Sequence, residues 1–198
     1  VQTFPTAAPA VQCMVVTTVS NMLDTPPAFL HEMIAPLVPA FCALAANENE
    51  HLRIAVALFL VILPHTYRDL AAVYLGLVLE CLAVFLTDPR KAIFIDGLNV
   101  AMSVLACFPD SVIDLITRLM PRLFRRVVVS DEMVAELDDA EQGAGSVSRS
   151  NVDYNWNERN AFFDMAAAIA HSYGPAVVDV LNTCWFRAFQ EAQQAGDD

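Results

Sequence analysis

The sequence predicts an all-helical protein, a solenoid of about four antiparallel helix pairs. Three observations predict it: a composition that favours helices, short breaks containing proline or glycine between apolar segments, and a register shared from one pair of segments to the next. Glycine is scarce, with 6 residues in 198, and hydrophobic residues make up 56% of the chain. Since alanine and leucine are strong helix formers and most tight turns need glycine, this composition favours helices over a sheet.

Short breaks divide the chain into four pairs of helical segments. The predicted pairs are Pro9–Leu23 with Pro27–Ala46, His51–Leu63 with Arg68–Leu86, Arg90–Phe108 with Ser111–Val128, and Trp156–Tyr173 with Pro175–Gln193. A proline lies in the break within each pair, where it ends one helix or enters the first turn of the next. Because each break within a pair is short, the two helices must fold back antiparallel.

The pairs also share a register along the chain. Asp69-Leu70 and Asp114-Leu115 lie 45 residues apart, and the steps Leu37-Val38-Pro39 and Leu119-Met120-Pro121 lie 82 residues apart. The first spacing equals one period, and the second equals two periods, of the about 40–47 residues found in HEAT and armadillo arrays. We therefore predict one HEAT-like segment over residues 1–198, with an acidic loop inserted at 130–154.

The helix predicted over Ser111–Val128 is amphipathic. Its apolar positions fall on one side at helical spacing: Ile113, Ile116, Leu119, Met120, Leu123 and Val127. Its basic positions fall on the opposite side: Arg118, Arg122, Arg125 and Arg126. The pattern is typical of a surface helix, and the arginines are candidate partner-binding residues.

The middle of the chain is apolar on all sides. Ile54–Leu63 is continuously apolar, and Leu70–Leu86 is interrupted only by Glu80. Such helices are buried either in protein or in membrane. Membrane insertion is an open alternative, since the second stretch is at the lower limit for a span, but Glu80 would cost a few kcal/mol in lipid. An inner helix between neighbouring repeats explains the pattern without that cost.

The charge balance bears on the partners. The net charge is −12, and the isoelectric point is near 4.5. A protein that follows a nucleic-acid backbone needs an excess of lysine and arginine, so we expect no direct nucleic-acid binding.

The five cysteines are odd in number, widely spaced and set among apolar residues, which predicts buried reduced thiols in the cytoplasm or nucleus. We predict no signal peptide and expect the chain to be a segment of a longer protein.

No sequence pattern indicates an enzyme. The glycine-rich phosphate-binding loops, the nucleophile elbow and the zinc-protease motif are all missing from the sequence. The four histidines form no ligand pair at helical spacing. We therefore predict no catalytic residue, no metal site and no cofactor.

The segment Ser130–Tyr154 interrupts the helical pattern. Its acidic residues include Asp131, Glu132, Glu136, Asp138, Asp139 and Glu141, and its centre is small and polar. It has too little apolar surface to order itself, so we predict a mobile acidic loop. Together with Trp156, which follows the loop, these acidic residues are candidate partner-binding residues. A solvated linker beside a solvated helix face explains the same composition.

Two passages resemble one known family. The passages Leu137-Asp138-Asp139-Ala140-Glu141 and Asp153–Ala161, which contains Trp156-Asn157, look like the karyopherin-β family of nuclear transport receptors. Members such as transportin and importin-β carry an acidic loop inside a central HEAT repeat, and a Trp-Asn pair opens the following helix. The resemblance covers about 30 residues, within the period of one such repeat.

The resemblance implies a carrier of basic cargo that is controlled by the small GTPase Ran and contacts phenylalanine-glycine nucleoporins, moving between cytoplasm and nucleus. Carried over, it places cargo or Ran contacts on Asp131–Glu141 and on an inner face that includes Arg118, Arg122 and Arg125. A HEAT or armadillo scaffold of an unrelated assembly, with the loop as a spacer, remains an alternative. An integral membrane helical bundle is the second alternative.

Overall fold

The structure is a computed structural model that describes residues 6–128 and 149–174, together with Phe4, Asn182, Thr183, Phe186 and Gln190. The described helices are α1 (Pro9–Leu23), α2 (Ala28–Cys42), α3 (Glu50–Thr66), α4 (Arg68–Val73), α5 (Leu75–Leu86), α6 (Lys91–Cys107), α7 (Pro109–Val128) and α9 (Arg149–Tyr173). No strand occurs among these residues, so the predicted all-helical class is confirmed. The chain divides into two compact units, Val1–Val112 and Ile113–Asp198.

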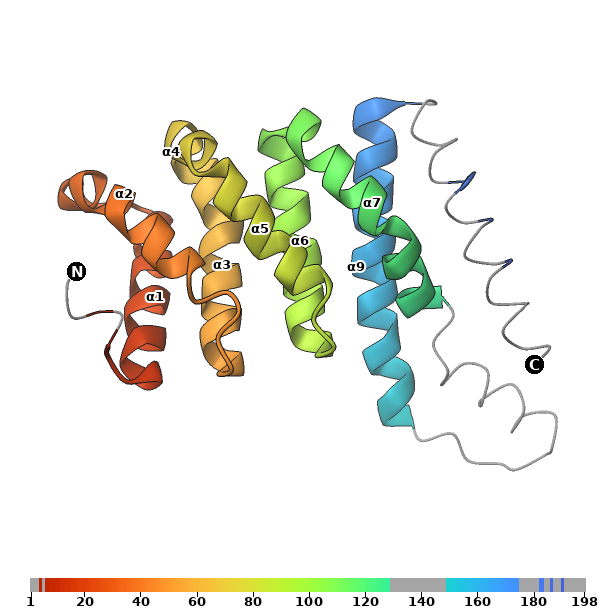
Figure 1. Cartoon of the computed structure of the whole chain (residues 1–198), viewed down its shortest axis with the longest axis horizontal. Helices are drawn as coiled ribbons and strands as arrows, with labels where there is room; N and C mark the ends of the chain where they lie inside the picture. Colours follow the sequence, from red (N-terminus) through yellow and green to blue (C-terminus); the bar gives the residue numbers. More distant parts are fainter. Residues whose placement is uncertain are drawn as a thin grey trace. The chain divides into compact units, whose positions relative to one another are not determined.

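In the first unit the helices form two layers (Figure 1). The first layer contains α1, α3 and α6 side by side, with α3 in contact with both of the others. The second layer contains α2 and α5, which contact each other, and α5 also packs on α6. Within a layer, each contact thus joins neighbouring helices: α1 with α3 and α3 with α6 in the first layer, and α2 with α5 in the second.

Aromatic side chains fill the space between the two layers. Phe41 of α2, Phe59 of α3, Phe85 of α5 and Phe94 of α6 are all fully buried. The rings of Phe41 and Phe59 meet edge to face, with centroids 5.0 Å apart at 81°. Burying one such side chain stabilises the fold by about 1.5–3 kcal/mol, and an edge-to-face pair adds about 0.5–1.5 kcal/mol. The burial of these phenylalanines therefore contributes much of the free energy that stabilises the packing of the two layers.

A buried ion pair joins the turns at one end of the first unit. Arg53 of α3 pairs with Asp88, which lies in the turn before α6, and both are nearly inaccessible. Arg53 Nε also donates to the Ala45 carbonyl at 3.1 Å, and the Arg90 backbone N–H donates to Asp88 Oδ1 at 2.8 Å. Since each charged group has hydrogen-bond partners, the cost of burying the two charges is largely offset.

Several predicted helix boundaries agree with the structure, and the predicted helix over 68–86 differs most. It is interrupted at Tyr74, where α4 ends and α5 begins. It is also not buried on all sides, because Val73 is 75% exposed and Glu80 is exposed. The physical reason is that the helices packed on it, α3 on α4 and α2 and α6 on α5, leave part of its surface open. Among the described helices, none has the length and apolar content needed to cross a bilayer.

The cysteines agree in part with the expectation of buried thiols. Cys42, Cys81 and Cys107 are buried and unbridged, whereas Cys13 is only half-buried. Cys184 lies outside the described residues. The Cys81 thiol donates to the Cys42 carbonyl at 3.5 Å. Its hydrogen bond with the Cys42 side chain and its burial both raise the pKa of Cys81, which keeps it a neutral thiol.

The second unit contains α7 and α9. The buried residues of α7 there are Ile116, Met120, Leu123 and Val127, all members of the predicted apolar stripe. The α9 helix buries Phe162, Met165 and Ile169, which also share one helical face. The apolar stripe of α7 is thus confirmed, although Ile113 and Leu119 remain half-buried at its edge.

The ends of α9 show one agreement and one difference. The helix ends where predicted, because Gly174 adopts a φ of 65° and its N–H donates to the Ala170 carbonyl at 2.9 Å. It begins at Arg149 rather than at Trp156. Residues 149–154, which we expected in the acidic loop, are therefore helical, and Trp156 lies inside the helix rather than opening it. The helix predicted over Pro175–Gln193 lies mostly outside the described residues.

Candidate functional site

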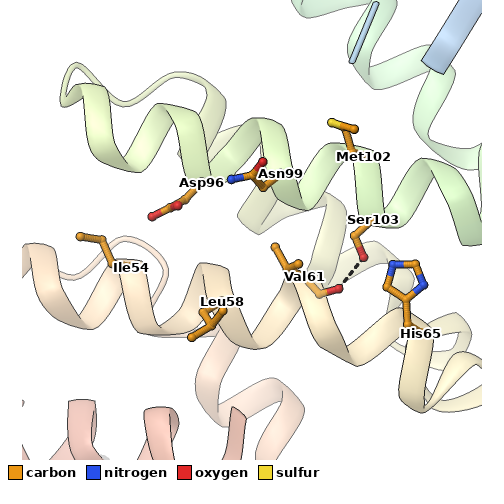
Figure 2. Close-up of a pocket in the computed structure, with 8 residues that line it drawn as sticks. All are labelled: Ile54, Leu58, Val61, His65, Asp96, Asn99, Met102 and Ser103. Atoms are coloured by element: carbon orange, nitrogen blue, oxygen red, sulfur yellow. Dashed lines mark hydrogen bonds between the residues drawn. The ribbon is translucent and has the colours of Figure 1, made fainter. Parts of the chain in front are cut away.

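A groove of about 510 Å³ runs between α3 and α6 on the first unit. The α3 side is lined by Ile54, Leu58, Val61 and His65, and the α6 side by Asp96, Asn99, Met102 and Ser103 (Figure 2). Positions three, four or seven residues apart share one face of a helix. The groove is therefore the seam between the outward faces of two adjacent helices.

The α3 side of the groove is apolar. Leu58 is 42% exposed, and Ile54 and Val61 are half-buried. The neighbouring positions Phe59 and Leu60 are fully buried in the core, so Leu58 is the position at which α3 presents a large apolar side chain to solvent. An exposed leucine alone is ordinary, but one that lines a groove offers a surface for another apolar group.

Asp96 is the acidic group of the groove. Its carboxylate is directed into the space between α3 and α6 (Figure 2). It is half-buried, and this burial raises its pKa to about 6. Among the described residues it has no hydrogen-bond or ion-pair partner. A partly desolvated carboxylate without a partner lowers the stability of the folded chain, because burial disfavours its charged form.

Hydrogen bonds hold the two helices together at the other end of the groove. Ser103 Oγ donates to the Val61 carbonyl at 2.5 Å. The Cys107 thiol donates to the Pro64 carbonyl at 3.5 Å, and its sulfur lies 3.6 Å from His65 Nδ1. These contacts fix the spacing of α3 and α6, and hence the width of the groove.

The Cys107–His65 contact resembles a nucleophile beside a base, but its electrostatics differ. Burial raises the pKa of Cys107, and the nearby Arg68 guanidinium only partly opposes that effect. Arg68 Nη2 donates to the Cys107 carbonyl at 3.0 Å and its guanidinium lies 5.8 Å from the Phe108 ring centroid. Since a reactive cysteine needs a lowered pKa, this arrangement favours a structural thiol.

The candidate residues predicted from the sequence lie elsewhere. Six of them lie outside the described residues: Asp131, Glu132, Glu136, Asp138, Asp139 and Glu141. Trp156 is in α9 and Arg125 is in α7, but their side chains are not among those that the structure describes. Arg118 and Arg122 are exposed on α7, and Arg118 Nε donates to the Asp114 carbonyl at 3.3 Å. None of the described candidates is among the residues that line the α3–α6 groove.

Arg126 has a structural contact that the sequence pattern did not indicate. Its Nη2 lies 3.1 Å from Oε1 of Glu158, a residue of α9 that is only 6% exposed. On the same side, Arg159 Nε donates to the Val127 carbonyl at 3.2 Å. These contacts join α7 to α9, so the four-arginine face is not uniformly free for a partner.

The groove was missed at the sequence level. The available signals were an apolar stretch over Ile54–Leu63 and a lone acid, Asp96, in the mainly apolar helix predicted over Arg90–Phe108. Neither shows which helical faces meet, because that depends on how α3 packs on α6.

Comparison with protein-family models, with curated proteins and with solved structures found no match. Within the described ranges, no three histidine, cysteine or acidic side chains lie close enough to hold a metal ion.

Proposed function

We propose that this chain is a helical-repeat module that binds other proteins. In this proposal the helices of the first unit form an α-solenoid of antiparallel pairs, with α1–α2 and α3 with α4–α5 as successive repeats and α6 as the first helix of the next. The binding surface includes the groove between the first helices of two neighbouring repeats, α3 and α6.

A series of hydrogen bonds between helices supports the repeat architecture. Each joins residues 38 to 43 positions apart in the sequence. Two join α1 or its end to α3, Cys13 to His51 and Thr66 to Leu23; one joins α2 to α5, Cys81 to Cys42; and two join α3 to α6, Ser103 to Val61 and Cys107 to Pro64. This recurring separation is close to the period of about 40–47 residues in HEAT and armadillo arrays.

The observation that carries the binding function is the open groove. It combines an exposed Leu58 with Asp96, a half-buried carboxylate that lacks a partner among the described residues. A concave, mainly apolar surface with a few polar groups is the usual form of a binding site. Its position between neighbouring repeats is also where helical-repeat proteins present extended binding surfaces.

A narrower proposal is that the module belongs to a Ran-regulated nuclear transport receptor. What supports it is the resemblance of Leu137–Glu141 and Asp153–Ala161 to the karyopherin-β family, together with the net charge of −12 that suits basic cargo. A pull-down of the parent protein with Ran tests it. We expect retention of the GTP-loaded form over the GDP-loaded form, and equal retention would refute this narrower proposal. A scaffold of an unrelated assembly would then be the better assignment.

Selection from a random peptide display library tests the broader proposal. We expect the immobilised chain to enrich peptides whose binding falls in a Leu58→Ser variant and persists in a Val73→Ser variant. Val73 is the matched control, because it is an exposed apolar residue of the same unit that does not line the groove. No enrichment over the bare support, or peptides that bind both variants equally, would contradict binding at this groove.

A further inference from the structure

We propose that the α3–α6 groove binds a protein segment that carries a lysine or arginine beside an aliphatic side chain. The cation pairs with Asp96, and the aliphatic group packs on Leu58. This inference rests on the proposed protein-binding function and deepens it by naming the chemistry of the partner.

Asp96 is the first reason for a basic partner. Its carboxylate is half-buried, directed into the groove and without a hydrogen-bond or ion-pair partner among the described residues (Figure 2). A charge at a partly desolvated site interacts with an opposite charge more strongly than it would in bulk water. A guanidinium or ammonium group bound there would supply the charge-assisted hydrogen bonds that the carboxylate lacks.

The apolar wall opposite Asp96 is the second reason. On the opposite side, that of α3, Leu58 is 42% exposed and Ile54 is half-buried, and Met102 of α6 adds a half-buried apolar side chain to the same groove. Lysine and arginine carry a charged end on an aliphatic stem, and such stems pack along apolar surface while the charge reaches a polar partner. One basic side chain with an aliphatic neighbour therefore matches both kinds of surface in the groove.

The far end of the groove is less suited to a cation. Ser103 already donates to the Val61 carbonyl, and His65 contacts the Cys107 sulfur. Neither residue brings a second carboxylate to the groove. The groove is thus polarised, with one acidic end near Asp96, and this polarity sets the direction of a bound segment.

The charge of the whole chain favours a different protein over a second copy of itself. The chain has 23 aspartate and glutamate residues but only 11 lysine and arginine residues. Two copies would approach each other with a net charge of −12 each, so self-association meets repulsion. The same charge attracts a basic segment and speeds its encounter.

The library peptides whose binding falls in the Leu58→Ser variant provide the ligand for the test. We expect the enriched sequences to share a lysine or arginine at a fixed distance from an aliphatic residue. A synthetic peptide of this kind is then compared with a copy in which citrulline, an uncharged analogue, replaces the arginine. We expect the citrulline change to weaken binding to the native chain about tenfold or more, and to change binding to an Asp96→Asn variant about threefold or less. Far-ultraviolet circular dichroism and a denaturation curve establish that the variant is folded.

The outcomes separate this inference from the broader proposal. Groove-dependent peptides without a basic residue, or a citrulline effect that is equal in both chains, would overturn the basic partner while leaving protein binding intact. Sedimentation equilibrium that shows a dimer broken by Leu58→Ser would assign the groove to a second copy and would also overturn it. Failure of the library to yield any groove-dependent peptide would count against both.

Discussion

Asp88 and Asp96 lie just before and within α6, and their surroundings are opposite. Asp88 is buried at the helix start, paired with Arg53 and hydrogen-bonded to the Arg90 backbone. Asp96 is half-buried in the groove and has no such partner among the described residues, so burial raises its pKa to about 6. The Asp88 carboxylate has its ion-pair and hydrogen-bond partners within the fold. The ionised Asp96 carboxylate lowers the stability of the fold, and a bound cation would remove that loss. This difference separates a structural acid from a binding acid.

The largest expected effect comes from breaking the buried pair. Asp88→Ala leaves the Arg53 guanidinium buried without its counter-charge, which should lower the free energy of unfolding by about 3–5 kcal/mol. Urea denaturation at neutral pH measures it. The double variant Arg53→Met/Asp88→Leu, which removes both charges, should recover much of the loss. A single variant within about 1 kcal/mol of the native chain would show that the pair is not a structural element.

A second large effect is expected at Gly97, where α6 lies close against Phe85 of α5. A Cβ atom added at Gly97 of α6 would lie 2.9 Å from Cβ of Phe85 and 3.1 Å from its backbone carbon. Gly97→Ala should therefore destabilise the fold by about 1–3 kcal/mol despite the better helix propensity of alanine. Gly76→Ala in α5 is the matched control, because nothing lies within 4 Å of its added Cβ. It should raise stability by up to about 1 kcal/mol, and a Gly97→Ala variant that does the same would contradict this close approach.

A smaller effect of opposite sign is expected at Asp96. Its pKa in the folded chain, about 6, exceeds the usual value of 3.8, so the unfolded chain ionises first as pH rises. The stability that the neutral acid provides is present below pH 4 and lost as pH rises through 6. Asp96→Asn should thus raise the free energy of unfolding by about 1 kcal/mol at pH 8, allowing for solvent screening, and by little at pH 4.

Denaturation curves at both pH values measure this difference. His65, the other titratable side chain of the groove, is the same in the native chain and in the variant. Glu80→Gln on the exposed side of α5 is the control and should stay within about 0.5 kcal/mol at both pH values. Equal stability of the native chain and Asp96→Asn at pH 8 would show that Asp96 carries no cost.

The smallest effect on stability is expected for the groove leucine. Leu58→Ala should cost about 1 kcal/mol or less, since the side chain is 42% exposed. Leu60→Ala, on the same helix but fully buried, should cost about 2–5 kcal/mol. Thermal denaturation compares the two. Similar losses would mean that Leu58 belongs to the core rather than to an open groove.

The sequence predicted most of the described helices, but not the break at Tyr74, the start of α9 at Arg149 or the contacts between helices. Local signals marked some helix boundaries correctly. Pro9 begins α1, and Gly174 follows the end of α9 with a positive φ, which a residue without a Cβ adopts readily. Contacts between distant residues were not predictable in this way. Arg53 meets Asp88 and Arg126 meets Glu158 only because particular faces of particular helices pack together. The uncovered position of Asp96 depends on the same packing, so the groove was missed.

The most direct test measures two properties of one variant, the stability and the peptide affinity of Asp96→Asn at pH 8. If Asp96 destabilises the fold and binds the cation, the variant should change the two properties in opposite directions. Its free energy of unfolding should be higher by about 1 kcal/mol, and its affinity for the arginine-containing peptide should be lower by about tenfold. A variant that loses stability, or that binds the peptide as tightly as the native chain, would contradict the assignment of this groove to a basic partner.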